Sequence, residues 1–407
     1  MNTNLHSANP FSLSRCTQTC GTARALPVAL LSASLLTLSF PSHSADLGDL
    51  LQSGDTIADF RLRYESNDTD DTTDSATALT LRSRLGYETT SFSGFKVLAE
   101  IEDVRAVIDE YRPEDSDYDV VADPENSEFN RVQISYAKDG IHAVIGRQRI
   151  ILDNARFIGN VGWRQNEQTF DAVKFGYKKD DLNLVYAFID QVNSILFTET
   201  DMSNHLLNVA YSGLSAGTIS GYAYLLENDD TEATLDTFGV RFNGKYTVDS
   251  ADILYRAEYA TQTSESGDTE FDASYYLIEA GVKVSGLTLT AGNETLGSDN
   301  GEYGFDTPLA TKHAFNGWAD KFLGTGSDGL SDTYIQAAGV AYGTKLVAVY
   351  HDYSGDDSGD DRGSEVNILA ARKINKQFSA GLKYADYSAG DIGSDTQKLW
   401  LWGQAKF

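Results

Sequence analysis

Cysteine, methionine and proline are scarce in this chain of 407 residues, which contains two, two and six of them. Both cysteines, Cys16 and Cys20, precede an apolar run at 25–40, so no lipobox is present and no lipid anchor is expected. Beyond residue 45, no apolar run approaches the length of a membrane-spanning helix. That absence is normal in a soluble periplasmic protein. It is required of an outer-membrane protein, because a long apolar helix would be retained in the inner membrane.

The first 45 residues have the composition of a secretory signal peptide. Arg15 and Arg24 precede the apolar run, which is too short to span a bilayer, and small residues follow it. We predict cleavage after Ala45, with Ser44 as the alternative. The mature chain, 46–407, is then exported and contains no cysteine.

Basic residues are also few. The chain has 32 lysines and arginines against 60 aspartates and glutamates, which gives a formal charge of -28. A nucleic-acid partner is not expected, because phosphate binding needs a positive surface. Tyrosine (22), phenylalanine (19) and glycine (35) are abundant instead. This composition favours many strands with tight turns and aromatic borders.

Alternation of apolar and polar residues predicts strands that contact an apolar medium on one side only. In 57–64, Phe60 and Leu62 share one face, and Arg61 and Arg63 share the other. About eighteen such runs occur, and roughly twenty residues per strand and turn is the pitch of a bacterial outer-membrane barrel. The runs lie near residues 57, 79, 95, 131, 141, 170, 182, 205, 218, 235, 253, 274, 287, 333, 345, 365, 378 and 397.

The connections between these runs are of two kinds. Short turns are predicted at 178–181, 212–217 and 285–286, and long acidic loops are predicted at 67–74, 110–128, 261–272 and 354–361. Short turns at one end and long loops at the other are what a closed antiparallel barrel requires. The predicted fold is therefore an all-β, closed antiparallel transmembrane barrel of about 18 strands, formed by 46–407 as a single domain.

Two observations weigh against a soluble β-sandwich or a solenoid. No internal repeat of fixed period is present, which argues against the solenoid. The last run is apolar on one face and ends on Phe407, and such an ending resembles the signal that the barrel-assembly machinery recognises. We therefore expect that machinery to be a partner of the last strand.

Two segments are too long and too irregular to be turns. The first, 146–171, concentrates arginine in an otherwise acidic chain, and the second, 306–323, combines aromatic with polar residues. Long connections of this kind are usually functional. We expect both segments to insert into the barrel or to cap it. The alternatives are a solvated loop for the first and a loop packed over the barrel mouth for the second.

No catalytic or metal-binding arrangement is visible. His142, His205, His313 and His351 are widely scattered, without a carboxylate or a second histidine at ligand spacing. No Gly-Xaa-Ser-Xaa-Gly motif occurs, although a Ser–His pair can also form between distant residues. The acidic run 352–361 lacks the glycine and the closing glutamate of an EF-hand loop. We predict no enzyme activity, cofactor or metal, and we interpret the acidic loops as solvated segments that divalent ions could bridge to lipopolysaccharide.

Arginines on the polar strand faces are the most informative residues. In a barrel these faces line a water-filled lumen, where charge is tolerated, and clustered arginines there favour anions. The alternative is that each arginine pairs with a neighbouring lumen acid, such as Glu88, Glu100, Glu102 or Glu258, and only holds the wall. With residues of the two irregular segments, the pore-lining candidates are Arg61, Arg63, Arg82, Arg84, Arg131, Arg147, Arg149, Arg156, Trp163, Arg164, Arg241, Arg256, Asn316, Trp318, Asp320 and Lys321.

In both irregular segments the chain resembles the alginate-export outer-membrane porins. The matching stretches are GRQRIILDNARFIGNVGWRQNEQTFDAV, from Gly146, and PLATKHAFNGWADKFL, from Pro308. The resemblance implies a monomeric barrel of eighteen strands in the outer membrane of a Gram-negative bacterium. It also implies passage of an anionic polyuronate, or of smaller anionic sugars, through an arginine-lined pore.

Members of this family also include general and substrate-specific uptake porins. A sugar-uptake porin without alginate specificity is therefore the first alternative, and a barrel enzyme or an adhesin is a further one. The expected partners are the lipid bilayer, lipopolysaccharide and anionic saccharide solutes.

Overall fold

The computed structural model describes residues 53–71 and 73–407, so the predicted signal peptide at 1–45 lies outside the described residues. Within them, one antiparallel sheet contains 18 strands. Each alternating run predicted from the sequence lies in one of these strands. They are β1 (Asp55–Thr69), β2 (Ala76–Glu88), β3 (Phe95–Glu110), β4 (Asn126–Lys138), β5 (Ile141–Gln148), β6 (Thr169–Lys179), β7 (Leu182–Asn193), β8 (Glu199–Leu214), β9 (Gly217–Asn228), β10 (Ala233–Val248), β11 (Ala251–Ser266), β12 (Thr269–Val284), β13 (Leu287–Leu296), β16 (Leu330–Ala341), β17 (Thr344–Ser354), β18 (Asp361–Lys373), β19 (Phe378–Ser388) and β20 (Thr396–Lys406).

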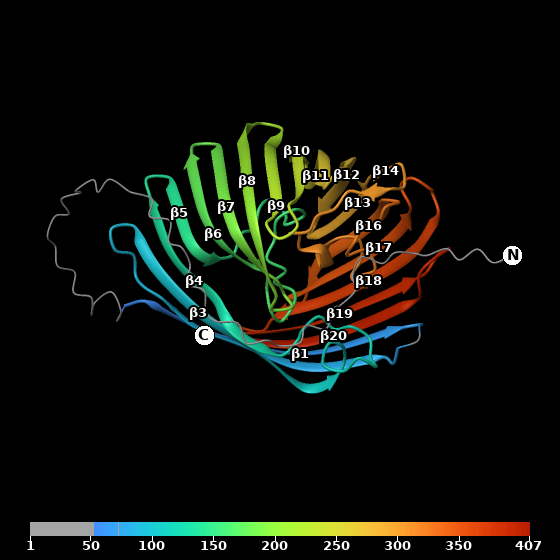
Figure 1. Cartoon of the computed structure of the whole chain (residues 1–407), viewed down its shortest axis with the longest axis horizontal. Coiled ribbons are helices and arrows are strands. Elements are labelled where there is room, and N and C mark those ends of the chain that lie inside the picture. The colour runs from blue at the N-terminus through green and yellow to red at the C-terminus, as the bar shows by residue number, and fades with distance from the viewer. Residues whose placement is uncertain (1–52, 72) are drawn as a thin grey trace. The chain divides into compact units, whose positions relative to one another are not determined.

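The sheet closes on itself. β1 pairs with β2 on one side and with β20 on the other. The register between β1 and β20 runs from Asp59 opposite Lys406 to Thr69 opposite Thr396. Figure 1 shows β20, in red, beside β1, in blue. The predicted closed barrel is confirmed, and it leaves no strand edge that would face lipid with unpaired backbone groups.

The two ends of the barrel differ. Tight turns join strands at one end, which we call the turn end; examples are 139–140, 180–181 and 285–286. β1 begins and β20 ends at the turn end. The connections at the other end, the loop end, include 111–125, 149–168 and 297–329. The last of these contains a small ladder of β14 (Ser298–Asp299) and β15 (Tyr303–Gly304) and the short 3-10 helix η1 (Lys312–Ala314).

One predicted loop is wrong. Residues 261–272 were expected to form a long connection, but β11 continues to Ser266, β12 begins at Thr269, and only a tight turn separates them. Residues 67–69, also expected in a loop, belong to β1. Both stretches are acidic, and β-strands that rise past the membrane into water can carry charge on both faces.

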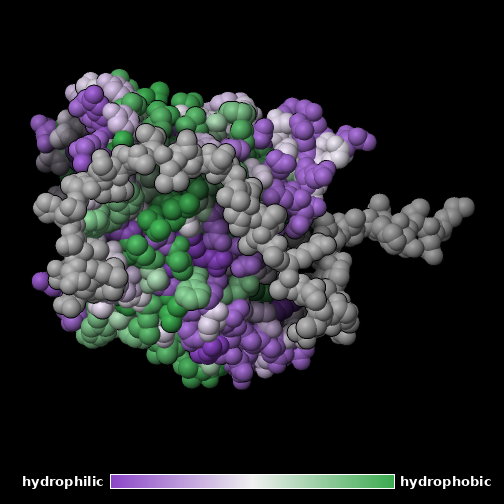
Figure 2. Space-filling model, turned by 60° about the vertical axis from the view of Figure 1, so that its left-hand side comes forward, coloured by the Kyte–Doolittle hydropathy of each residue, from purple (hydrophilic) through white to green (hydrophobic). Residues whose placement is uncertain are grey.

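The wall is apolar outside and polar inside. Along β1, the lumen-facing Arg61 is 7% exposed, whereas its outward-facing neighbour Leu62 is 47% exposed. Figure 2 shows broad apolar areas on the visible surface, with hydrophilic residues gathered in separate patches. No helix in the described part of the chain is long and apolar enough to cross a membrane.

Aromatic side chains border the apolar outer surface of the wall at the turn end. Phe95 packs against Tyr136 with ring centroids 4.7 Å apart, and Phe378 packs edge-on against Phe407 at 6.0 Å. The N–H of Phe407 also donates to the carbonyl of Ala58 (2.8 Å), so the last residue is bound to the first strand. Such aromatic girdles mark the level of the lipid headgroups.

Candidate functional site

Two connections at the loop end fold into the lumen and contact each other. We call 149–168, between β5 and β6, the first inner loop, and 297–329, between β13 and β16, the second inner loop. The N–H of Gly159 donates to the carbonyl of Leu309 (2.8 Å). Only glycine fits at this contact, because a Cβ atom on Gly159 would lie 2.2 Å from Thr311 Oγ1.

Two buried arginines of the first inner loop bind the wall. Arg164 donates to Glu65 of β1 (3.0 Å) and to Asp320 of the second inner loop (2.9 Å). Arg156 donates to Glu294 of β13 (2.8 Å). Removing one partner of such a buried pair costs roughly 3–5 kcal/mol. Both inner loops are therefore held firmly in the lumen.

Asn316 links the same network to a further strand. Its side-chain oxygen accepts from Arg156 (3.0 Å), and its amide donates to Glu294 (2.8 Å) and to Asp332 of β16 (3.1 Å). All four side chains are buried. Asn316 thus positions the second inner loop, and it does so with every polar atom of its side chain in use.

Most wall arginines, and Arg149 of the first inner loop, are paired with lumen acids, as the alternative prediction had it. Each of them lies within ion-pair distance of at least one carboxylate. The pairs are Arg63 with Glu65 and Asp123, Arg82 with Asp59, Arg84 with Glu102 and Glu167, Arg131 with Glu100, and Arg149 with Glu167 and Glu100.

Arg61 is different. Its Nε donates to the side-chain oxygen of Gln165 (2.8 Å), and its two terminal nitrogens donate to the backbone carbonyls of Gly162 and Arg164. Within 53–71 and 73–407 it forms no ion pair with a carboxylate. Its charge therefore binds the first inner loop without being neutralised.

Arg61 lies at a cavity near the turn end of β1 to β4 and β20, which we call the basic cavity. Its volume is about 550 Å³. Twice as many basic as acidic side chains line it, so it keeps a positive charge after pairing. The basic residues are Arg61, Arg82, Arg84, Arg131, Arg149 and Lys406, and the acidic residues are Asp59, Glu100 and Glu167.

Glu167 remains ionised at any physiological pH. Burial alone would raise the pKa of its carboxyl, but Arg84 and Arg149 outweigh burial and lower this pKa to about 2. The side-chain amides of Asn130 (2.8 Å) and Asn160 (2.6 Å) also donate to it. Glu167 therefore connects the first inner loop to the wall as a permanent carboxylate.

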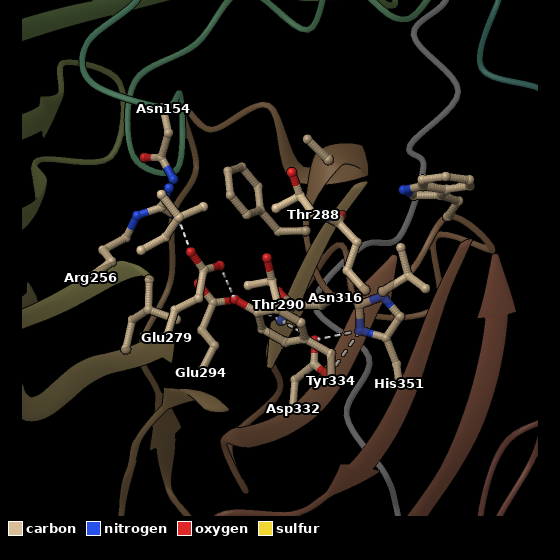
Figure 3. Close-up of a pocket in the computed structure, with 17 residues that line it drawn as sticks. Asn154, Arg256, Glu279, Thr288, Thr290, Glu294, Asn316, Asp332, Tyr334 and His351 are labelled. Atoms are coloured by element: carbon tan, nitrogen blue, oxygen red, sulfur yellow. Dashed lines mark hydrogen bonds and ion pairs between the residues drawn. The ribbon is translucent and has the colours of Figure 1, made fainter. Parts of the chain in front are cut away.

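A second cavity, which we call the acidic cavity, lies against β11 to β17. It has a volume of about 420 Å³ and is lined by Glu279, Glu294 and Asp332, with Arg256 as the only arginine or lysine. Figure 3 shows Arg256 and Glu279 on one side of it, His351 and Asp332 on the other, and Asn154 reaching in from the first inner loop. The lumen therefore offers two cavities lined by charges of opposite sign.

Comparison with known families decides what kind of molecule this is. The family model for alginate export matches residues 55–293, which is more than half of the chain. The chain belongs to the alginate export family. It is thus an outer-membrane channel protein and not an enzyme, and its turn end faces the periplasm. No curated protein matches the chain.

Solved structures share the fold of this alginate export family member. OccAB4 of Acinetobacter baumannii matches with a TM-score of 0.68 and 12% identity, over 86% of this chain and 97% of that one. OccK9 (OpdG) of Pseudomonas aeruginosa matches with a TM-score of 0.68 and 12% identity, over 88% and 100%. OccAB3 of A. baumannii matches with a TM-score of 0.64 and 16% identity, over 87% and 100%. At these identities, the likeness shows the fold.

The aromatic candidates of this family member meet at one point of its lumen. Trp163 of the first inner loop stacks on His313 of the second, with ring centroids 4.9 Å apart, and packs edge-on against Trp400 and Trp402 of β20. The backbone N–H of Trp318 donates to Glu365 of β18. We call these four indoles the tryptophan cluster.

The remaining candidates lie around the same centre or on the far wall. Asp320 accepts from Arg164 and contacts His313, and Lys321 Nζ donates to Thr396 Oγ1 (3.0 Å). Arg241 donates to Asn154 of the first inner loop (3.0 Å), and Arg256 lies 3.6 Å from Glu279. Arg241 and Arg256 face the lumen, but not the basic cavity.

Arg147 does not line the pore. It lies opposite Val132 in the β4–β5 register, and Val132 is 46% exposed on the outer face of the wall. Residues directly opposite in an antiparallel pair share one face. Arg147 therefore points outward, where it forms a bidentate pair with Asp171 (2.8 and 3.0 Å). The prediction failed because it placed Arg147 in the irregular segment that begins at Gly146, whereas β5 continues to Gln148 in unbroken register with β4.

Sequence reasoning missed two groups at the centre of the lumen. Lys383 of β19 is buried in the tryptophan cluster, and His313 hydrogen-bonds to Asp320, seven residues later. No carboxylate stands at metal-ligand spacing from His313 in the sequence, so its interaction with Asp320 was not predicted. In an irregular loop, that spacing carries no information. The nearby pattern of three aromatic residues around 313–322 was the only available signal.

Proposed function

We propose that the chain is a passive channel for small anionic solutes, with short acidic saccharides as the solute class. The observation that carries this proposal is the basic cavity, where Arg61 has no carboxylate partner among the described residues and six basic side chains face three acids. Guanidinium groups bind carboxylates with two parallel hydrogen bonds, and they stay charged at any working pH. Uronate units present one such carboxylate each.

The inner loops favour short solutes over a long polymer. Both loops lie inside the barrel. Buried ion pairs bind the first inner loop to β1 and β13, and Asp320 of the second inner loop pairs with Arg164 of the first. The basic and acidic cavities, of about 550 and 420 Å³, have the size of sites for drug-sized ligands. A chain of many sugar units would need the loops to leave.

Reversal potentials across a planar bilayer in a salt gradient test the proposal. The wild-type channel is expected to prefer chloride to potassium, and added short oligouronates should block the current more than neutral oligosaccharides of equal length. Arg149→Gln, in the basic cavity, should reduce both effects. Arg149 is 28% exposed, so this variant is expected to fold.

The matched control lies on an outer loop. Asp357→Asn changes the net charge by one unit, as Arg149→Gln does, but with the opposite sign. Asp357 is exposed in the connection at 355–360, and at 0.1 M salt or above, where exposed charges are screened, the selectivity of this variant should match that of the wild type. A cation-selective wild-type channel would contradict the proposal and would leave the arginines as wall residues only. Equal block by neutral sugars would favour a sugar-uptake porin without preference for acids.

We also propose two partners that the sequence suggested. The C-terminal strand β20, which ends beside Phe407, would be read by the barrel-assembly machinery. The acidic loops would meet lipopolysaccharide through divalent cations. Deletion of Phe407 should slow assembly of the barrel in cells, measured as loss of the heat-modifiable folded form.

A further inference from the structure

Lys383 lies in a cage of three tryptophans. Its Nζ is 3.9 Å from the ring centre of Trp318, 4.3 Å from that of Trp163 and 5.7 Å from that of Trp400. Such contacts stabilise a desolvated ammonium. Within the described residues, Lys383 has no ion pair with a carboxylate. Since Trp163 and Trp318 belong to different inner loops, this one side chain of the wall contacts both.

His313 provides the only hydrogen-bond acceptor found for Lys383 in the described chain. Nζ of Lys383 lies 2.6 Å from Nε2 of His313, and Nδ1 of His313 lies 2.7 Å from Asp320 Oδ1. With Lys383 as an ammonium, one protonation state satisfies every group. Neutral His313 carries its proton on Nδ1 and donates to Asp320, while Nε2 accepts from the ammonium. A second proton, on Nε2, would place two cationic donors face to face.

The surroundings do not compensate for a second proton. Of the charged groups around this pair, Asp320 lies on the second inner loop, Arg164 on the first, and Glu365 on β18. Arg63 of β1 and Lys398 of β20 face the same space. Asp320 is already shared by Arg164 (2.9 Å) and Lys398 (3.5 Å). Arg164 also pairs with Glu65, and Arg63 with Asp123. Counting Lys383, four positive groups meet four carboxylates here, so no excess of negative charge compensates for one more positive charge.

We propose that Lys383 and His313 form an acid-sensitive latch, which holds both inner loops in the lumen at neutral pH and releases them when His313 is protonated. Lys383 is the positioning residue, since it contacts both inner loops from the wall. The inference rests on the channel function of the barrel, and it does not depend on which solute passes.

The sign of the pH dependence follows from the closed state. Burial lowers the pKa of His313 to about 3. The positive charges of Lys383 and Arg164 add to this shift, and the carboxylate of Asp320 opposes it. A histidine released into water has a pKa of about 6.5. The latch is therefore fully stabilised above about pH 6.5 and loses this stabilisation as pH falls toward 3. Between pH 7.5 and pH 5, the ratio of released to latched molecules should rise about 30-fold.

Tryptophan fluorescence reports on the latch directly. The chain has four tryptophans, and all of them form the tryptophan cluster around Lys383 and His313. Purified full-length barrel in detergent should show a red-shifted emission and greater quenching by acrylamide at pH 5 than at pH 7.5, reversibly. The heat-modifiable folded form should persist at both pH values, which separates release of the loops from unfolding of the barrel.

His313→Gln is the decisive variant. A glutamine can donate to Asp320 through its amide nitrogen and accept from Lys383 through its oxygen, but it cannot be protonated. Its tryptophans should stay protected at pH 5. A merely structural role predicts instead a variant that is loosened at every pH. His205→Gln, on the outer face of β8, removes a distant histidine and should respond to acid as the wild type does.

Conductance provides an independent measurement. Wild-type channels should show larger and noisier currents at pH 5 than at pH 7.5, and Lys383→Met should show them already at pH 7.5. The proposal is overturned if His313→Gln keeps the full acid response, or if the wild-type emission and current are unchanged between the two pH values. Loss of anion selectivity at pH 7.5 would instead concern the proposed solute and leave the latch intact.

Discussion

Gly317 sets how closely the second inner loop can approach β18. Its φ is 86°, and a Cβ atom there would lie 2.2 Å from Glu365 Oε2 and 2.3 Å from Tyr353 Oη. Gly317→Ala combines a clash with a backbone conformation that costs roughly 1–3 kcal/mol for residues other than glycine. We expect Trp318 to shift from its place in the tryptophan cluster, so that acrylamide quenching rises at pH 7.5.

The same loop offers a matched control for Gly317. A Cβ atom added to Gly324 meets nothing within 4 Å. Gly324→Ala should quench like the wild type. Equal quenching in the two variants would mean that the loop tolerates displacement at Gly317, and that its position does not depend on this close approach.

Among the arginines, Arg164 should contribute most to holding the inner loops in place. Arg164→Gln removes the arginine that two buried carboxylates share, and breaking a buried pair costs roughly 3–5 kcal/mol. Glu65 then keeps only Arg63, and Asp320 keeps Lys398 and His313. We expect the inner loops to become sensitive to added protease while the strands stay protected. Arg105→Gln removes an exposed arginine paired with Asp103 (2.7 Å), a kind of pair worth about 0–1 kcal/mol. Cleavage of that variant at the wild-type rate is the expected control, and comparable cleavage in both would argue that Arg164 does not hold the loops.

The strands could be predicted from the sequence, because each contacts lipid on one face and the lumen on the other. That asymmetry gives a period of two, which depends on neighbours in the sequence alone. It gives no clear signal where a strand extends past the membrane, as at 261–272, or at a strand end, as at Arg147, where β5 continues to Gln148. The inner loops could be located because they break the period. Their partners could not be predicted, because Arg156 meets Glu294 and Arg164 meets Asp320 across more than a hundred residues of intervening strands and loops.

Shortening an inner loop separates its role from that of the wall. Replacing 308–322 with a short Gly-Ser linker removes Asn316, Trp318 and Asp320 but leaves every strand intact. Since the barrel closes through β1 and β20, we expect it to fold and to conduct severalfold more current. Anion preference should persist, because the basic cavity is built mainly from β1 to β4 and β20. A similar replacement of 356–359 at the loop end should leave the conductance unchanged, and a silent channel after the first replacement would show that the inner loop does not restrict the pore.

The net charge of the molecule and the charge of its pore have opposite signs. Acidic residues predominate on the exposed connections at the loop end, such as Asp70, Asp71, Asp115, Asp357 and Asp360. The basic residues are concentrated in the lumen, near the other end. An ion entering from outside therefore meets these acidic residues, which we call the acidic rim, before it meets the basic cavity. The distance over which each charge acts on the ion depends on the salt concentration.

This separation predicts an unusual dependence of selectivity on salt. The Debye length is about 30 Å at 0.01 M, about 10 Å at 0.1 M and about 3 Å at 1 M. At 0.01 M the acidic rim should oppose the entry of anions. At 0.1 M the charge of the rim should be screened, while the basic cavity still acts on ions that contact its walls. Anion preference in reversal-potential measurements should therefore rise between 0.01 and 0.1 M, whereas in a pore with charge of one sign it only falls as salt is added. Asp115→Asn with Asp357→Asn should flatten the rise, and Arg149→Gln should lower the preference at every concentration. A preference that declines steadily from 0.01 M would show that the rim does not act on permeating ions, and that the excess of acidic residues serves another purpose.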